Sequence, residues 1–190
     1  MYGEVYAQSN GTAFVPGLNE GVCLVGFSVT DTEYGRALDV KFEKDGSYLD
    51  GRAYEVNPEK VTPKQVWRNK VQVMETKEEA VLAAFGDFNS WVKSIVTAFI
   101  SEEEYIAAIT GKTTFEDFIE ACKAALPEDF ATRKGRLITT YNTKGYLSVP
   151  SKYWVTGNFF TTKPEVTLTV GKRVVTVKPE APTNTAATNW

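Results

Sequence analysis

The stretch from Leu18 to Val56 constrains the fold more than any other part of the chain, because it reads as three consecutive strands joined by short turns. In its middle segment, residues 37–43, apolar and charged side chains alternate, which predicts a strand with one buried face and one exposed face. Asp45-Gly46 then predicts a tight hairpin, because both residues tolerate the positive φ angles that such turns need. The three expected strands cover residues 22–29, 37–43 and 47–56.

The order of the expected elements predicts an α+β fold built on an OB-like antiparallel β-barrel. The three-strand meander is followed by a helical insert over about residues 62–126, and strands return over 134–141 and 146–150. Three strands, a helical segment and further strands are the chain order of an OB-type barrel. We therefore expect the insert to lie between strands three and four of the barrel, and the barrel domain to span residues 1–163.

Two helix-start signals open the insert. Thr62 followed by Pro63 predicts a helix that runs to about Met74, because Thr is a good cap and Pro is favoured at the first helical position. Thr76, with Glu79 three residues later, fits a capping box and predicts a second helix start.

The second of these helices is the strongest in the chain. Apolar residues recur at three- and four-residue steps over residues 76–100, which is typical of a helix packed on a core. Gly86 interrupts the pattern and costs about 1 kcal/mol relative to alanine in a helix interior, so a break there is an alternative to one continuous helix. Ser101 and Thr114 are expected to cap two further helices.

The C-terminal part predicts a β-hairpin over residues 164–178. Two β-branched segments flank Gly171-Lys172, a pattern typical of a type II′ turn. Because an isolated hairpin is only marginally stable, we expect it to pack on the barrel or on a second subunit, which would make the protein a homo-oligomer. Residues 179–190 are expected to form a flexible tail.

The composition argues against an enzyme and against a bound metal or cofactor. The chain has no histidine, which removes the usual Ser-His and Cys-His nucleophile pairs and the commonest metal ligand. Its two cysteines, Cys23 and Cys122, fall in a predicted strand and a predicted helix, and we expect two buried free thiols in a reducing cytosol. We expect no membrane association, since no apolar run is long enough to cross a bilayer.

The charge is unevenly distributed along the chain. Residues 76–130 contain 4 basic and 11 acidic residues, whereas residues 131–190 contain 9 basic and 2 acidic residues. An acidic helical middle and a basic last third predict two electrostatically different faces, although accidental clustering on a soluble surface is the competing interpretation.

Cationic and aromatic residues are mixed on the predicted strands and their loops. Single-stranded nucleic acid needs this mixture, because Lys and Arg pair with phosphates while flat rings stack on unpaired bases. An OB barrel presents its second and third strands and two of its loops, here residues 30–36 and 142–145, to its ligand. The candidate binding residues are Arg36, Lys41, Tyr48, Arg52, Tyr54, Arg133, Lys134, Arg136, Tyr141, Lys144, Tyr146, Lys152, Tyr153 and Trp154.

Three segments resemble phage-encoded single-stranded DNA-binding proteins of the OB-fold type. Val15-Pro16-Gly17-Leu18-Asn19-Glu20-Gly21-Val22-Cys23-Leu24 is similar to their opening "pGinenvkL", and Gly35-Arg36-Ala37-Leu38-Asp39-Val40-Lys41-Phe42-Glu43 to their following "G-x-x-L-x-x-x-F" strand. Tyr141-Asn142-Thr143-Lys144-Gly145-Tyr146-Leu147-Ser148-Val149-Pro150-Ser151 resembles their late "y-n-x-k-G-y-x-x-l-P" segment.

This resemblance implies an OB fold, single-stranded DNA as the partner, and a role in phage DNA replication or recombination in the host cytoplasm. It also implies contacts with replication or recombination proteins. Many proteins of this class recruit those partners through an acidic tail, whereas this chain ends with only Lys178 and Glu180 as charged residues near its terminus. That difference speaks against this mode of partner recruitment.

We therefore expect single-stranded DNA binding with little sequence specificity and without catalysis. The alternative from a different class is a phage structural or assembly protein that acts through protein–protein contacts, for which a projecting hairpin and a flexible tail would be suited. Replacing Tyr54 or Trp154 by Ala should weaken oligonucleotide binding under the first hypothesis and leave the fold intact.

Overall fold

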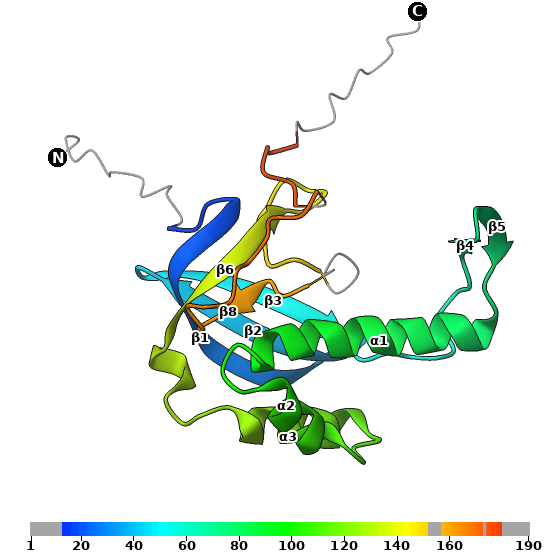
Figure 1. The fold of residues 1–190 in the computed structure, drawn as a ribbon, viewed down its shortest axis with the longest axis horizontal. Helices are drawn as coiled ribbons and strands as arrows, with labels where there is room; N and C mark the ends of the chain where they lie inside the picture. Colours follow the sequence, from blue (N-terminus) through cyan, green and yellow to red (C-terminus); the bar gives the residue numbers. More distant parts are fainter. Residues whose placement is uncertain (1–12, 152–156, 173, 180–190) are drawn as a thin grey trace, which may run out of the picture.

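The structure is a computed structural model that describes residues 13–151, 157–172 and 174–179. Over these residues the chain forms a nearly closed five-strand antiparallel barrel, with three helices inserted between β5 and β6 (Figure 1). The α+β class predicted from the sequence is confirmed. The predicted tail beyond Pro179 lies outside the described residues.

The barrel strands follow the order β3-β2-β1-β6-β7. β7 returns to the side of β3, where a Cβ on Gly51 would lie 3.2 Å from Val149, so the glycine lets the two edges approach closely. This order is compatible with an OB-like barrel. The strands are β1 (Gly17–Thr32), β2 (Gly35–Lys44), β3 (Ser47–Tyr54), β6 (Lys134–Tyr141) and β7 (Leu147–Ser148), with β8 (Phe160–Thr161) paired to β6.

The long strand β1 is shared between the two halves of the barrel. Its first half, from Gly17 to Cys23, pairs with β6, and its second half, from Cys23 to Thr32, pairs with β2. Two register shifts bend it, one on each side of Cys23, and Gly21 supplies the positive φ of 72° at the first. The bends allow one strand to line two walls.

The predicted meander is confirmed. Asp45 and Gly46 both have positive φ, 48° and 78°, as the Asp-Gly hairpin requires. The alternation in β2 also holds, because Leu38, Val40 and Phe42 are buried in the core.

The three helices begin where the capping residues predicted. α1 (Lys77–Val96) starts with a complete capping box between Thr76 and Glu79. α2 (Glu102–Ile109) is capped by Ser101, and α3 (Phe115–Ala125) by Thr114; a short 3-10 turn, η1 (Phe130–Thr132), follows. α1 is continuous through Gly86, so the alternative of a break there is wrong.

The second half of α1 closes the barrel core. Phe88, Trp91 and Ile95 are buried there, and the Trp91 side chain is only 1% exposed. The indole Nε1 of Trp91 donates a hydrogen bond to the Pro150 carbonyl at 2.8 Å, and its ring stacks on Phe159. α1 thus packs against the segment that leads out of β7.

The helix predicted over residues 63–74 is wrong, because this segment forms a β-hairpin. β4 (Gln65–Arg68) pairs with β5 (Val71–Met74) through a turn at Asn69 and Lys70, whose φ angles are 49° and 65°. Val66 and Val73 are consistent with one helical face, but here they are cross-strand neighbours. The β-branched residues follow the period of a strand, and the helical spacing was a coincidence.

The C-terminal hairpin is also absent from the described residues. A turn does form, since the Val174 amide donates to the Gly171 carbonyl at 3.0 Å, but the described residues of 164–178 contain no strand. The segment packs along β6 instead: the Tyr141 amide donates to the Val175 carbonyl, and Leu168 is buried in the core. The described residues therefore offer no hairpin through which the expected self-association could occur, and self-association itself stays a prediction.

Candidate nucleic-acid interface

The outer face of β2 and β3 gathers four of the predicted binding residues. The two strands pair without a register shift, so every second residue of each strand lies on the same face. The apolar residues of β2 point into the core, which turns the residues between them outward. The structure thus places Lys41, Tyr48, Arg52 and Tyr54 on one face, together with the acidic residues Asp39, Glu43 and Asp50.

A bidentate ion pair crosses this face. Arg52 donates from Nε to Asp39 Oδ1 at 2.5 Å and from Nη2 to Oδ2 at 2.7 Å. The hydrogen bond from Arg52 lowers the pKa of the Asp39 carboxyl, and the same contact, together with Tyr54, raises the pKa of the guanidinium. The Arg52 side chain is 45% exposed and that of Asp39 is 26% exposed, so solvent screens the pair, which orients Arg52 at the surface but adds little to stability.

Next to this pair lies an exposed tyrosine with a cation beside its ring. Tyr48 is 62% exposed, and the Lys41 ammonium lies 5.8 Å from the centre of its ring. Lys41 is also 4.0 Å from Asp50. On the other side, Gly26 of β1 is paired with Lys41, and a Cβ at Gly26 would lie 3.0 Å from the Lys41 Cβ. The glycine therefore leaves the sheet surface low beside Lys41.

Arg36 is separated from this group and serves the fold. Its Nε and Nη2 donate to the two carboxylate oxygens of Glu55 at 2.8 and 2.9 Å. Its guanidinium also contacts the Glu116 carboxylate and lies 5.5 Å from the centre of the Phe115 ring. Arg36 thus fastens the start of α3 to β2, and two carboxylates already balance its charge.

The predicted cations of the C-terminal third are divided between structural and exposed positions. Arg136 donates from Nη2 to the carbonyls of Lys163, Pro164 and Val166 at 2.7, 3.2 and 2.7 Å, and so holds the C-terminal segment on β6. Arg133 pairs with Asp129 at the 3-10 turn.

The remaining predicted residues of the C-terminal third that the structure describes lie at the two ends of β6 and at the β6–β7 turn. Lys144 and Tyr146 are exposed there, Tyr141 is half-buried at the end of β6, and Lys134 is exposed at its start. Asn142 organises the turn, since its side-chain oxygen accepts hydrogen bonds from the amides of Lys144 and Tyr146. The predicted residues Lys152, Tyr153 and Trp154 lie outside the described residues.

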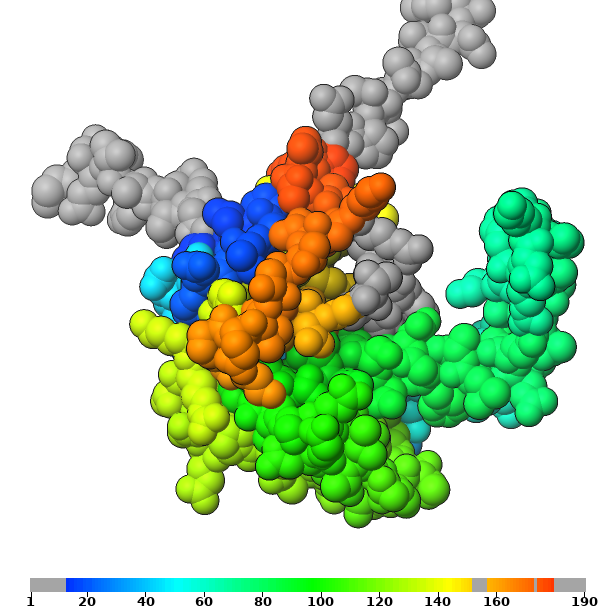
Figure 2. All heavy atoms as spheres, in the orientation of Figure 1, coloured from blue at the N-terminus to red at the C-terminus, as the bar shows by residue number. Residues whose placement is uncertain are grey.

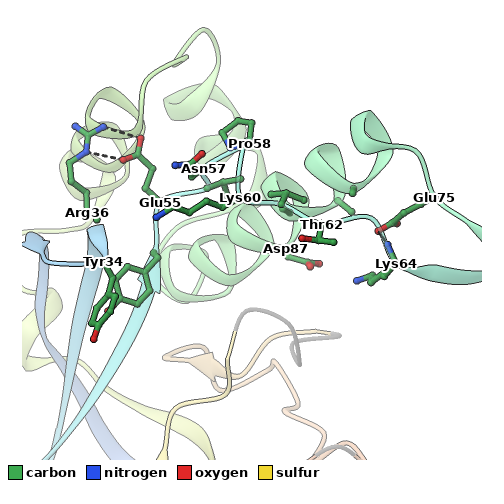
Figure 3. Close-up of a pocket in the computed structure, with 17 residues that line it drawn as sticks. Tyr34, Arg36, Glu55, Asn57, Pro58, Lys60, Thr62, Lys64, Glu75 and Asp87 are labelled. Carbon is green, nitrogen blue, oxygen red and sulfur yellow. Dashed lines mark hydrogen bonds and ion pairs between the residues drawn. The ribbon is translucent and has the colours of Figure 1, made fainter.

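A groove of about 640 Å³ continues from the end of this sheet face. It is lined by Tyr34 of the β1–β2 turn, Tyr54 of β3, the segment after β3 and the first half of α1. In Figure 3, Tyr34 lies at one end, Lys60 in the middle, and Lys64 and Glu75 at the other end. Sequence reasoning missed Tyr34, Lys60 and Lys64. The exposed aromatic ring of Tyr34 in the loop of residues 30–36 was the one available signal.

A second, more apolar hollow of about 710 Å³ lies between α1 and α3. Arg36 and Glu55 line both hollows, so their ion pair stands at the border between them. Four phenylalanines line the second hollow, Phe85, Phe88, Phe115 and Phe118.

Among the described residues, no group of three or more His, Cys, Asp and Glu is placed to hold a metal ion. Cys23 and Cys122 are both free and buried, as predicted. Burial raises the pKa of the Cys122 thiol to about 12, so it is protonated and unreactive at neutral pH.

Comparison with protein-family models, with curated proteins and with solved structures gave no match for this chain. Within the described residues, no helix combines the length and the apolar character that a bilayer crossing requires.

Proposed function

We propose that the barrel is an OB fold that binds single-stranded DNA with little sequence specificity, on the outer face of β2 and β3. The observation that carries this proposal is the exposed ring of Tyr48 beside the Lys41 ammonium, on the strand pair that an OB barrel presents to its ligand. A base can stack on the ring while the ammonium meets the adjoining phosphate. The resemblance to phage single-stranded DNA-binding proteins favours a role in phage DNA replication and recombination.

The ion pair of Arg52 and Asp39 supports the same reading. Solvent reaches both partners of the pair and weakens it, and the two parallel donors of the guanidinium that bind the Asp39 carboxylate can bind a phosphate in the same way. A phosphate can therefore replace Asp39 as the partner of Arg52. Before binding, Asp39 keeps the guanidinium fixed at the surface, which reduces the entropy lost when DNA binds.

The three acidic residues on this face set a limit on affinity. Asp39, Glu43 and Asp50 offset the cations of the sheet, so the phosphate contacts must be few and local. Binding should therefore depend on stacking more than on counterion release, and its salt dependence should be modest, with a slope of about 0.7 per phosphate contacted.

The first experiment is a fluorescence anisotropy titration of the full chain with a labelled, unstructured DNA oligonucleotide over a salt series. Binding that weakens as salt rises is expected. The absence of binding at low salt would refute the proposal.

Variants then place the interface. Tyr48→Ala should weaken binding by about 5-fold to 150-fold, because stacking on one ring contributes about 1–3 kcal/mol. Lys41→Gln should weaken binding and lower the salt slope by about 0.7. Lys123→Gln on α3 is the matched control and should bind like the parent. If Tyr48→Ala also binds like the parent, the interface is elsewhere.

A protein-assembly function is the second candidate, and one observation favours it. The β4–β5 hairpin stands away from the barrel and exposes Trp67, Val71 and Met74. Under this function, sedimentation would show self-association or a partner complex, and the oligonucleotide titration would show no binding.

A further inference from the structure

The β4–β5 hairpin lies in solvent and is attached to the N-terminal end of α1. Figures 1 and 2 show it at the far end of α1, away from the barrel. None of residues 65–74 is buried, although two-stranded hairpins are only marginally stable alone. We name residues 57–87, which comprise the hairpin, its linker and the first half of α1, the arm.

Several polar contacts hold the hairpin on the helix. Arg68 Nη2 lies 2.7 Å from Glu79 Oε1, on the first turn of α1. The Lys64 amide donates to Glu75 Oε1 at 3.1 Å, and the Glu75 amide donates to the Lys64 carbonyl at 3.1 Å. Lys77 Nζ donates to the carbonyls of Glu59 and Val61. The hairpin is thus fixed by its base and by one face.

The other face of the hairpin is open and carries a tryptophan. Directly opposed residues of an antiparallel pair share a face, so Arg68 and Val71 lie together on the side that meets Glu79. The opposite side carries Trp67, which is 72% exposed. Its neighbours on that side are Met74, Gln65 and Gln72, all exposed. This face offers one large ring, a thioether and two amides.

The segment from Lys60 to Met74, between Glu59 and Glu75, is basic. Residues 60–74 contain Lys60, Lys64, Arg68 and Lys70 and no acidic residue. None of the ion pairs formed between described residues includes Lys60, Lys64 or Lys70. Three ammonium groups outside any ion pair, on the same arm as an exposed indole, complement a polyanion with flat bases. A protein partner fits less well, because the centres of protein interfaces are depleted in lysine.

The groove connects this element to the sheet face. In Figure 3 its lining extends from Tyr34 at one end to Lys64 and Glu75 at the other, at the base of the hairpin. Lys60 lies between these two ends. A strand that stacks on β3 can therefore follow the groove to the hairpin.

We propose that the β4–β5 hairpin is a second contact for single-stranded DNA, in which Trp67 stacks on a base and Lys60, Lys64 and Lys70 neutralise phosphates. This inference rests on the proposed function of the barrel and extends it to a longer footprint. The arm would then contact the DNA strand at a distance from the β2–β3 face.

The test compares two oligonucleotide lengths, about 6 nucleotides and about 24 nucleotides, because one OB barrel covers about 4–16 nucleotides. Trp67→Ala should bind the long oligonucleotide about 5-fold to 150-fold more weakly than the parent and the short one equally well. Trp67→Phe keeps a ring and should restore most of the loss.

The double variant Lys64→Gln/Lys70→Gln should lower the salt slope for the long oligonucleotide by about 1.4. The matched control Lys112→Gln/Lys123→Gln should not change it.

A spectroscopic signal tests the stacking directly. The parent's tryptophan emission should be quenched by the long oligonucleotide, and Trp67→Phe should remove most of that quenching.

The outcomes separate the two proposals. If Trp67→Ala and the lysine double variant bind the long oligonucleotide like the parent, while Tyr48→Ala binds it more weakly, the hairpin is no DNA contact and the barrel proposal stands. If the parent binds neither oligonucleotide, both proposals fail. Loss of self-association in Trp67→Ala, with unchanged DNA binding, would assign the hairpin to a protein partner.

Discussion

The barrel and the arm each contain a tryptophan, and the two rings have opposite surroundings. Trp91 is 1% exposed, stacks on Phe159 and satisfies its indole N–H with a carbonyl. Trp67 is 72% exposed and lies on a hairpin with no buried residue. A large apolar side chain in the barrel stabilises the fold, whereas the same side chain on the arm contributes little to folding and is available for binding. Folding thus depends on the barrel core far more than on the hairpin of the arm.

The largest expected difference between the two regions is in stability. Trp91→Ala should lower the free energy of unfolding by about 3–5 kcal/mol, because it leaves a cavity in the core and removes a hydrogen bond. Trp67→Ala should change it by less than about 0.5 kcal/mol, as exposed substitutions do. Urea denaturation followed by circular dichroism measures both. Equal losses in the two variants would show that the hairpin packs on the barrel in solution.

Two glycines should give effects of opposite sign. A Cβ on Gly135 would lie 2.5 Å from the Thr161 carbonyl oxygen and 2.9 Å from the Phe160 ring, so Gly135→Ala should cost about 1–3 kcal/mol. A Cβ on Gly86, in the arm half of α1, meets no described atom within 4 Å apart from its chain neighbours and the backbone of its own helix. Gly86→Ala should therefore stabilise the protein by up to about 1 kcal/mol. Thermal unfolding of both variants checks the signs; destabilisation by Gly86→Ala would mean that the helix bends there.

The smallest expected effect concerns two carboxyl groups with lowered pKa values. In the barrel, the hydrogen bond from Arg52 is the main cause for Asp39; in the arm, the main cause for Glu79 is the Thr76 amide, with Arg68 second. Arg52→Gln should therefore raise the pKa of Asp39 more than Arg68→Gln raises that of Glu79. Carbon-detected NMR titration of the carboxyl groups measures both shifts. A larger pKa shift at Glu79 than at Asp39 would show that Arg68, and not the Thr76 amide, is the main cause of the low pKa of Glu79.

The same two groups fix a pH window. A carboxyl whose pKa is lower in the folded state than in the unfolded chain contributes stability above the unfolded value, about 3.9 for Asp and 4.3 for Glu. That contribution is lost as pH falls through the folded value. The urea concentration at the unfolding midpoint should therefore decrease as the pH is lowered below about 4. This decrease should be less steep in Asp39→Asn than in the parent.

The parts of the fold that sequence reasoning predicted are those with local causes. The alternation in β2, the Asp45-Gly46 turn and the caps at Thr76, Ser101 and Thr114 each act over a few residues, and each was found. The β4–β5 hairpin was missed because Asn69-Lys70 lacks the glycine that marks most two-residue turns, while Thr62-Pro63 imitated a helix start.

The candidate site was less predictable because a cation's partners are often remote in sequence. Arg36 is balanced by Glu55 and Glu116, and Arg136 binds three carbonyls nearly thirty residues later. Counting basic residues could not separate these from Lys41, whose ammonium lies at the surface. The hairpin predicted over residues 164–178 was wrong for the same reason. The end of β6 hydrogen-bonds to Val175, whereas the local sequence pattern would pair the two halves of the segment with each other.

The division of β1 between two partners sets the order in which the chain can assemble. Its second half meets β2 across a short turn, so those contacts close early, while its first half waits for β6, whose Thr139 pairs with Gly17. During synthesis the helices therefore emerge before the barrel can close. For that period the first half of β1 is an unpaired edge, and it is the segment most open to mispairing with a neighbouring nascent chain.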